Sequence, residues 1–429
     1  MELKVNNVNK IQNAEIHLNG LTVIVGPNNS GKSTIGRTLF TTIKAVANSN
    51  YSTDLQRRKR LEKYIESLYQ RVRGLSWETR DVISSVFPNG SFRFMNEIVN
   101  AEDVIELLNT KRNIIEGLDI IPRQKNLILT DIDNIKILFE ESDNKEKIIK
   151  TELSYLVESE FINRFCAIGT QTSSVELNSE GTSKIVYDVE KNIVRNVKCT
   201  DTDFIDDATY VESPLYLHML DTIIRAKTYR EVNKKKSLML FTMVPFHIKD
   251  LAEKMMNAAR HPLLEYDRSL SIDQITGGTF AYDEESQQIV YKTTEGNTYS
   301  SINIASGLKT FGVLQLLLKG NYIGPNHMLI WDEPENHLHP EWQIKLAEIF
   351  VKLAKGGQPI LITTHSPYFL QAIKFYSSKE KFEKYVNYYI PADRDNNLVE
   401  LEEISRDLNR AFQLLAEPMN KIMEMDTEY

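Results

Sequence analysis

Cysteine is scarce in this 429-residue chain, which contains only Cys166 and Cys199. Two isolated cysteines are too few for a disulfide framework or a cysteine-bound metal site, so we expect both to be inert thiols. Long apolar runs are also missing, because even GVLQLLL falls far below the length of a membrane span. The opening residues, MELKVNNVNKIQ, lack the charged head and apolar stretch of a secretory signal. Together these absences predict a cytoplasmic protein.

An excess of positive charge is absent as well. The formal net charge is −8, so the surface as a whole is not expected to attract nucleic acid. Two local basic clusters nevertheless stand out, at residues 57–60 (RRKR) and 225–236 (RAKTYREVNKKK). Each is typical of a solvated helix face or loop. The alternative is that they contact the phosphate backbone of DNA or RNA, with Tyr229 beside the second cluster.

The stretch LTVIVGPNNSGKSTIGRTLF predicts an apolar strand, a glycine-rich turn and then a helix, which is the setting of a phosphate-binding loop. The loop residues are Gly26, Pro27, Asn28, Asn29, Ser30, Gly31, Lys32, Ser33 and Thr34. Gly26 and Gly31 permit a backbone that aims successive N–H groups inward, and Lys32 adds positive charge for the β- and γ-phosphates of ATP. Ser33 is expected to offer its hydroxyl to Mg²⁺, and Thr34 to contact the α-phosphate. A chance glycine-rich turn is the alternative.

Two adjacent carboxylates, Asp332 and Glu333, follow the apolar run Met328–Trp331. They therefore lie at the carboxyl end of a predicted buried strand, where ligands bind in parallel sheets. Because neighbouring residues on a strand point to opposite sides, the two acids are expected to have different roles. Asp332 would hold Mg²⁺ through its water shell, and Glu333 would polarise the attacking water. Alternatively, the acids simply begin a turn before Pro334.

Histidines occur at two further places of interest. His365 follows the predicted strand Pro359–Thr364, and we interpret it as a γ-phosphate contact, with a structural histidine as the alternative. His337 and His339 have a spacing found in metal sites. A turn followed by a helix from Pro340 explains them without a metal.

The stretch NIASGLKTFGVLQLLL joins a polar turn, Ser306-Gly307, to an apolar run that we predict to be helical. A helix start presents unpaired N–H groups, and the Ser306 hydroxyl adds a donor, so this is a second anion-binding helix start in a chain with one phosphate loop. A head-to-tail two-fold dimer accounts for the excess, because each copy would then complete the ATP site of the other. An ordinary helix cap is the alternative.

In this order, the four elements resemble those of ABC- and SMC-type head ATPases, and specifically the bacterial anti-phage branch that includes OLD-family ATPases and the Septu-type ATPase. The matching stretches are GPNNSGKST, ASGLK, DEPENHLHP and TTHSP, with a looser likeness in ATYVESPLYLHMLDTI. The resemblance covers residues 1–46 and 270–376. It implies an α/β P-loop NTPase with a mixed sheet flanked by helices, ATP and Mg²⁺ as cofactors, and a homodimer or a higher oligomer of dimers.

The resemblance also implies roles for particular residues. Ser306 and Gly307 would complete the partner's nucleotide site, and residues 336–339 would lie near the dimer seam. Gln171 is the candidate for the glutamine that senses Mg²⁺, with Gln12 and Gln70 left open. Leu308-Lys309 departs from the Gly-Gln or Gly-Glu of many transporters, and this lysine either adds charge near the phosphates or faces solvent.

Many more residues separate the phosphate loop from the Ser-Gly turn than a compact sheet domain needs, so we expect a mainly helical inserted lobe. Apolar residues at helical spacing over 61–72 predict a core stripe, and prolines and glycines between 88 and 122 exclude the long coiled-coil arm of chromosome-structuring relatives. The predicted divisions are 1–47 (head with the phosphate loop), 48–165 (helical insertion), 166–270 (further head strands and helical segments) and 271–429 (head with the Ser-Gly turn, acidic pair and His365).

Three functions fit these motifs. The first is an ATP-driven switch, in which the resemblance suggests an anti-phage sensor or regulatory subunit that controls a separate effector such as a nuclease. The second is an OLD-like metal-dependent nuclease, for which Asp393 and Asp395 are an acidic pair in a polar turn. The third is a DNA-bound repair-type ATPase, or a scaffold whose nucleotide only sets its oligomeric state.

Overall fold

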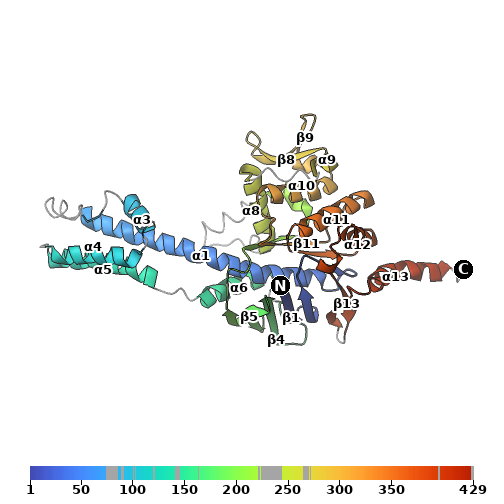
Figure 1. The fold of residues 1–429 in the computed structure, drawn as a ribbon, viewed down its shortest axis with the longest axis horizontal. Helices are drawn as coiled ribbons and strands as arrows, with labels where there is room; N and C mark the ends of the chain where they lie inside the picture. Colours follow the sequence, from blue (N-terminus) through green and yellow to red (C-terminus); the bar gives the residue numbers. More distant parts are fainter. Residues whose placement is uncertain are drawn as a thin grey trace. The chain divides into compact units, whose positions relative to one another are not determined.

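The computed structural model describes most of the chain, as two units (Figure 1). The described residues are 1–73, 86–87, 91–99, 101, 103–118, 121–140, 145–162, 164–220, 223, 244–263, 270, 272–394 and 397–426. The first unit comprises Met1–Ala47 and Ile149–Tyr429, and the second comprises Asn48–Ile148.

A mixed sheet forms the centre of the first unit. Among the described residues its strand order is β6 (Ile193–Cys199), β5 (Thr182–Glu190), β4 (Thr172–Ser179), β1 (Glu2–Val8), β2 (Ile11–His17), β14 (Val399–Glu403), β13 (Val386–Asp393), β3 (Leu21–Val25), β12 (Ile360–Thr364), β11 (His327–Asp332) and β7 (Asp207–Val211). The strands from β13 through β3, β12 and β11 to β7 are parallel, whereas β6, β5, β4, β1 and β2 are antiparallel. The predicted α/β class with a mixed sheet is confirmed.

The register of the parallel strands brings their carboxyl ends to one edge. Val25 pairs with Thr364, Asp332 with Thr363, and Val211 with Trp331. All five residues of β3 and of β12 are buried, which is typical of parallel strands covered on both faces. The loops that follow β3, β7, β11 and β12 therefore meet at this edge.

Alternate residues of the strands enter two hydrophobic cores, one on each face of the sheet. Leu329 and Trp331 pack with α8 (Phe246–Arg260), α10 (Ser306–Lys319), α11 (Pro340–Lys355) and α12 (Pro367–Lys379), which Figure 1 shows gathered on one side of β11. Met328 and Ile330 pack on the other face with the start of α1 (Lys32–Arg73) and with α6 (Lys145–Phe161). The alternation follows from the two-residue period of a strand.

A small antiparallel sheet covers α10. It consists of β8 (Gly278–Asp283), β9 (Gln288–Thr293) and β10 (Thr298–Ser300), and α9 (Ile272–Thr276) precedes it. A Cβ atom at Gly312 of α10 would lie 2.5 Å from the ring of Phe280 on β8, so the glycine allows the close approach. The rest of the first unit includes three short 3₁₀ helices, η1 (Pro214–His218), η4 (Ser301–Asn303) and η5 (Glu383–Tyr385), and α13 (Asn409–Asp426) among its described residues.

The second unit has its own hydrophobic core. It contains the later part of α1 with α3 (Ser91–Val99), α4 (Val104–Gly117) and α5 (Pro122–Glu140). The predicted stripe on α1 contributes Leu61, Ile65 and Leu68 to this core. The sequence-based boundary at residue 165 is too late, because most of α6 belongs to the first unit, where its apolar side chains are buried against the sheet. None of the helices within the described ranges is both long and apolar enough to cross a membrane.

Candidate functional site

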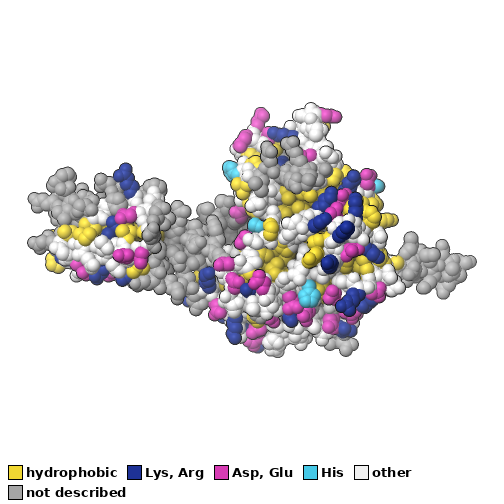
Figure 2. Space-filling view, in the orientation of Figure 1, with side chains coloured by type: hydrophobic (Ala, Val, Ile, Leu, Met, Phe, Trp, Pro, Cys, Tyr) yellow, Lys and Arg dark blue, Asp and Glu magenta, His cyan; other side chains and the backbone are white. Residues whose placement is uncertain are grey.

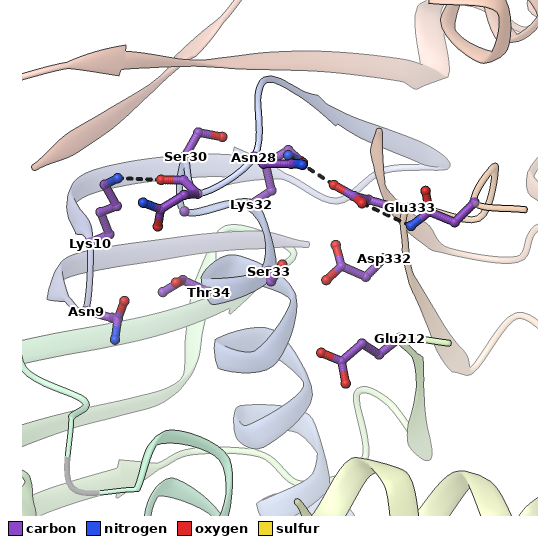
Figure 3. A pocket seen from close by; sticks show the side chains of 13 residues that line it. Asn9, Lys10, Asn28, Ser30, Lys32, Ser33, Thr34, Glu212, Asp332 and Glu333 are labelled. Carbon is purple, nitrogen blue, oxygen red and sulfur yellow. Dashed lines mark hydrogen bonds and ion pairs between the residues drawn. The ribbon is translucent and has the colours of Figure 1, made fainter. Parts of the chain in front are cut away.

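A polar cleft of about 400 Å³ opens at the carboxyl edge of the parallel strands (Figure 3). It is lined by Asn9, Lys10, Asn28, Asn29, Ser30, Gly31, Lys32, Ser33, Thr34, Glu212, Asp332, Glu333 and Asn336. The structure thus brings most of the predicted loop residues together with the acidic pair, although some 300 residues separate them in the sequence.

The loop between β3 and α1 has the backbone that its glycines and asparagines predict. Gly31 has φ +86° and Asn29 has φ +61°, and a Cβ at Gly31 would lie 2.5 Å from Cδ1 of Ile11. Gly26 donates its N–H to the carbonyl of Thr364 at 3.2 Å, which ties the loop to β12. The buried Lys32 donates from Nζ to the carbonyls of Gly26 (2.9 Å) and Pro27 (2.8 Å). The lysine is therefore held across the mouth of its own loop.

The turn between β1 and β2 adds two residues that the sequence analysis missed. Asn9 and Lys10 line the cleft, and Lys10 donates a hydrogen bond to the carbonyl of Asn29. Asn9 has φ +50°, a conformation that asparagine tolerates better than most residues. An asparagine-rich turn near the amino terminus was the available signal, but it carries no phosphate motif.

Asp332 is buried at the end of β11 and held by two hydroxyl groups. Tyr210 on β7 donates to Oδ2 at 3.1 Å, and Thr363 on β12 donates to Oδ1. Both neighbours come from the strands that flank β11 in the sheet. They fix the carboxylate without neutralising it, because a hydroxyl donor carries no charge.

Glu333, one residue further on, has left the strand. Its φ is +48°, a strained value for a glutamate, and its Oε1 lies 3.3 Å from Nζ of Lys32 and 3.3 Å from Nδ1 of His365. Asn336 donates to its other oxygen at 3.1 Å. The interaction with His365 outweighs burial and, with Asn336 and Lys32, lowers the pKa of Glu333 to about 2. The carboxylate is therefore ionised at neutral pH.

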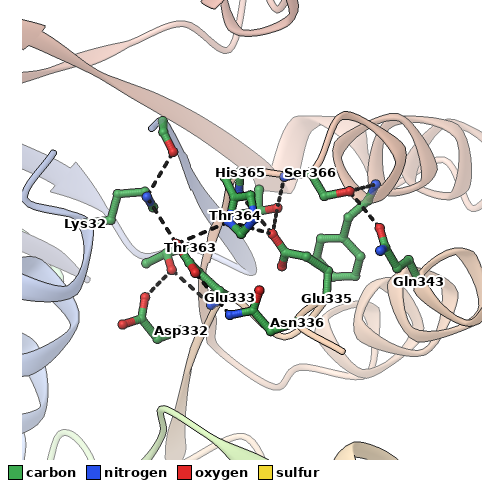
Figure 4. A network of polar contacts seen from close by, with 12 residues as sticks. Lys32, Asp332, Glu333, Glu335, Asn336, Gln343, Thr363, Thr364, His365 and Ser366 are labelled. Atoms are coloured by element: carbon green, nitrogen blue, oxygen red, sulfur yellow. Dashed lines mark hydrogen bonds and ion pairs between the residues drawn. The ribbon is translucent and has the colours of Figure 1, made fainter. Parts of the chain in front are cut away.

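Glu335 is a buried carboxylate that the sequence analysis did not single out. Figure 4 shows it beside Thr364 and His365, where its Oε1 accepts from the Thr364 hydroxyl at 2.6 Å and the His365 backbone N–H at 3.0 Å. Burial raises its pKa, whereas these donors lower it, and the net direction is upward. Glu335 therefore fixes the backbone at the end of β12, directly before His365.

His365 lies between the two glutamates. Its Nδ1 is 3.3 Å from Glu333 and 3.6 Å from Oε1 of Glu335, and the partner Glu333 raises its pKa against the effect of burial. Ser366 follows and caps α12 by accepting from the N–H of Phe369 at 3.2 Å. The polar network in Figure 4 therefore links the phosphate loop, the acidic pair and the histidine.

A family model described as an AAA ATPase domain matches residues 1–370 of the chain. This protein belongs to that family. The fold at the cleft agrees, because a phosphate loop after β3 faces an acidic strand end two strands away. The protein is therefore an ATP-binding ATPase.

A search of curated proteins finds no match to the ATPase. Among solved structures it is similar to three SMC heads. The SMC head domain from Thermotoga maritima is 13% identical, with 94% of this chain and 98% of that chain covered and a TM-score of 0.38. An SMC head bound to the C-winged helix domain of ScpA is 11% identical, with coverages of 95% and 98% and a TM-score of 0.40. An SMC head with an extended coiled coil, bound to the C-terminal domain of ScpA derived from Pyrococcus furiosus, is 13% identical, with coverages of 97% and 98% and a TM-score of 0.39. At such TM-scores and identities these structures are distant from the ATPase.

Gln171 of the ATPase does not line the cleft. It is exposed and directly precedes β4, which is separated from β3 by β1, β2, β14 and β13. Glu212 instead follows β7, the strand next to β11, and lines the cleft. The assignment of Gln171 as the Mg²⁺-sensing residue therefore loses its support, because strand order and not residue type decides which side chain arrives there. Gln12 borders a separate cavity, and the side chain of Gln70 lies outside the described part.

The Ser-Gly turn of the ATPase also lies apart from the cleft of its own chain. Ser306 and Gly307 begin α10, whose N-cap residue, Ala305, has no side-chain hydrogen bond to offer. A Cβ at Gly307 would lie 3.3 Å from the carbonyl of His337, so the helix start packs on the loop after the acidic pair. His339 caps α11, accepting from the N–H of Glu341 at 3.4 Å, as the turn interpretation predicts.

Proposed function

We propose that the ATPase binds ATP and Mg²⁺ between two copies of the chain arranged head to tail, and that hydrolysis separates them. The observation that carries this proposal is the position of Ser306-Gly307, which begins α10 with a half-buried serine and does not line the cleft formed by the phosphate loop of its own chain. Next to it lie Ile302, which is 67% exposed, and the exposed His337. A second copy would cover these residues and place the open start of α10 on its own γ-phosphate.

The donor set of the cleft fits Mg²⁺. The hydroxyl of Ser33 and the carboxylate of Asp332 both line it, and oxygen ligands are those that this hard cation prefers. When bound, the ion would neutralise charge on the β- and γ-phosphates. Asp332 already has its orientation fixed by Tyr210 and Thr363, so little rearrangement is needed to hold the ion through water.

The chain's own residues would then perform the reaction as follows. Lys32 exchanges the carbonyls of Gly26 and Pro27 for the phosphates, and in doing so it moves away from Glu333. Loss of this cation and arrival of a negative γ-phosphate both raise the pKa of Glu333 and make its carboxylate a better acceptor for the attacking water. His365 lies beside Glu333 and would contact the γ-phosphate, held in place by Glu335.

The Glu333→Gln variant tests this assignment. Gln keeps the shape of the side chain but accepts a proton poorly, so we expect turnover to fall by about a hundredfold or more while ATP still binds. In mass photometry with ATP, the variant should accumulate as a dimer that ADP does not support. Glu380→Gln is the matched control, because Glu380 pairs with Lys355 away from the cleft. Parental turnover in Glu333→Gln would remove Glu333 from the reaction.

An anti-phage role is the biological part of the proposal. The resemblance of GPNNSGKST, ASGLK, DEPENHLHP and TTHSP to that branch supports a sensor or regulatory ATPase that controls a separate effector such as a nuclease. Cells carrying the gene and its neighbours should resist phage, and Lys32→Ala should abolish the resistance. A DNA-bound repair-type ATPase is the alternative, and in that case loss of the gene would sensitise cells to DNA damage instead.

The OLD-like nuclease alternative has little support. Asp393 ends β13 beside Arg394, which pairs with Glu400, and Asp395 lies outside the described residues. Within the described ranges no group of three or more His, Cys, Asp or Glu side chains could hold a metal ion. Nuclease activity that disappears in Asp393→Ala would revive this alternative.

Nucleic-acid binding is a second candidate property, but through different residues from those predicted. The side chains of residues 57–60 and the whole of 225–236 lie outside the described part. Figure 2 shows Lys and Arg side chains gathered over α11 and α12, among hydrophobic ones. Within the described part, five lysines on α11, on α12 and in the stretch from α12 to η5 are exposed and form no salt bridge, and two exposed aromatic residues accompany them: Lys345, Lys374, Lys379, Lys381, Lys384, Tyr368 and Phe375.

Lys374 and Lys379 lie 6.0 Å and 5.6 Å from the ring centres of Phe412 and Tyr376 but form no salt bridge. Exposed lysines near exposed aromatic rings suit a single-stranded nucleic acid, since phosphates meet the charges and bases stack on the rings. We expect a labelled single-stranded oligonucleotide to bind with a strong dependence on salt. The double variant Lys374→Gln, Lys379→Gln should weaken binding and flatten that dependence, whereas the exposed Lys198→Gln on β6 should not. Equal binding by all three proteins would exclude this surface.

A further inference from the structure

A buried histidine beside the cleft has carboxylates on both of its ring nitrogens. His247, in the first turn of α8, is completely buried. Its Nδ1 lies 2.7 Å from Oε2 of Glu160 at the end of α6, and its Nε2 lies 3.0 Å from Oε2 of Glu212. The backbone N–H of His247 also donates to Oε1 of Glu160 at 2.9 Å. Glu160 therefore contacts both the ring and the backbone N–H of His247.

Glu212 connects this pair to the cleft. It follows β7 and lines the cleft with Ser33 and Asp332, as Figure 3 shows. Its Oε1 accepts from Arg37 at 2.7 Å, and its Oε2 also accepts from the Tyr216 hydroxyl at 2.9 Å. Arg37 stands one turn after Ser33 on α1. Both oxygens of Glu212 are thus engaged by side chains of the protein.

The four ionisable side chains compensate one another. Two carboxyl groups and the Arg37 guanidinium surround the imidazole, and a ring between two carboxyl groups is favoured in its positive form, which agrees with the raised pKa of His247. Burial raises the pKa of Glu212, but the hydrogen bond and charge of His247, together with Arg37 and Tyr216, outweigh it and lower the pKa to about 2. Without such partners a buried carboxylate and imidazole would be costly. The contacts from Arg37, Tyr216 and His247 therefore hold Glu212 in this orientation.

We propose that Glu160 and His247 are positioning residues for ATP hydrolysis, which hold the Glu212 carboxylate in place beside Asp332. The inference rests on the proposed function of the cleft, and it assigns control of the reaction rate to two side chains that do not line the cleft. Glu212 lies on the side of Ser33 and Asp332 and not among the loop amides that hold the phosphates. Disturbing its support should therefore slow hydrolysis more than it weakens ATP binding.

The experiment compares steady-state hydrolysis by His247→Gln, Glu212→Gln and the double variant. Gln at 247 can donate toward one carboxylate but not bridge both. We expect each single change to lower kcat by about tenfold, the effect of about one well-placed hydrogen bond to a charged group, with KM for ATP within about twofold of the parent. Because the two residues act in one chain of contacts, the double variant should be no slower than the slower single variant.

Controls separate positioning from general damage to α8. Lys254→Met removes another buried charge of α8. Lys254 pairs with Asp250 on α8 and with Asp207, which begins β7 at the end opposite Glu212. The variant should lower stability while leaving kcat unchanged. If His247→Gln does not fold, the milder variant Glu160→Gln takes its place, and we expect it to lower kcat by about threefold.

Three results would overturn the proposal: parental kcat in folded His247→Gln or Glu160→Gln, a fall in kcat for Lys254→Met equal to that for His247→Gln, or a multiplicative loss of about a hundredfold in the double variant. Failure of the proposed function would look different, because then Glu333→Gln would hydrolyse ATP at the parental rate whatever happens at His247.

Discussion

The ammonium group of Lys32 lies 3.3 Å from Oε1 of Glu333. This ion pair closes the cleft between the phosphate loop and the end of β11, and Lys32 is further occupied by the carbonyls of Gly26 and Pro27. In the proposed function the nucleotide phosphates displace these contacts, so binding of ATP would also release Glu333 from Lys32.

Lys32→Ala should weaken ATP binding strongly. Lys32 is the one lysine of the loop GPNNSGKST, and it lines the cleft. The substitution therefore removes a charge-assisted contact to phosphate. We expect the dissociation constant for ATP, measured by isothermal titration calorimetry, to rise by at least about tenfold. Lys198→Ala, on the exposed face of β6, should bind ATP like the parent. Unchanged affinity in Lys32→Ala would mean that the phosphates bind elsewhere.

Glu335→Gln should separate positioning from stability. Gln keeps an oxygen to accept from the Thr364 hydroxyl and the His365 N–H, so the free energy of unfolding should change by less than about 1 kcal/mol. Its neutral amide weakens the hold on His365, and turnover should fall by about tenfold. Glu335→Ala leaves both donors unpaired and should cost about 1–3 kcal/mol in urea unfolding. Parental turnover in folded Glu335→Gln would show that Glu335 only supports the fold.

Stability should depend on pH through Asp207. Burial alone would raise the pKa of this carboxyl, but the ammonium groups of Lys254 and Lys44 outweigh it and lower the pKa to about 2. A carboxyl with a lowered folded pKa stabilises the protein above its unfolded value and loses that contribution as pH falls. We therefore expect about 2 kcal/mol to disappear between roughly pH 4 and pH 2.

Urea unfolding across that range measures the Asp207 contribution. Asp207→Asn should be less stable than the parent at pH 6 and should converge toward it near pH 2. Asp203→Asn, a nearby exposed aspartate, is the control and should follow the parent throughout. A constant difference between Asp207→Asn and the parent at every pH would contradict the assignment.

The parts of this fold that the sequence predicted are local. LTVIV, HMLIW and ILITT are apolar runs of strand length, and the loop residues after each are identified by spacing alone. Glu212, Asn9 and Glu160 could not be found in this way, because their importance comes from pairing between distant segments, such as β7 with β11. Gln171 was the candidate for a glutamine that the family resemblance implies, and strand order places it away from the cleft. The second unit was foreseen as helical, but its end depends on which core buries α6.

The most direct test of the central claim mixes two inactive proteins. Lys32→Ala lacks a phosphate loop that binds, and Ser306→Arg blocks the helix start that the partner needs. In a head-to-tail dimer, a mixed pair contains one intact site, from the loop of one copy and the Ser-Gly turn of the other, so an equimolar mixture should recover about a quarter of parental turnover. If each chain instead completes its own site, the mixture will stay as inactive as either variant alone, and the head-to-tail account will be contradicted.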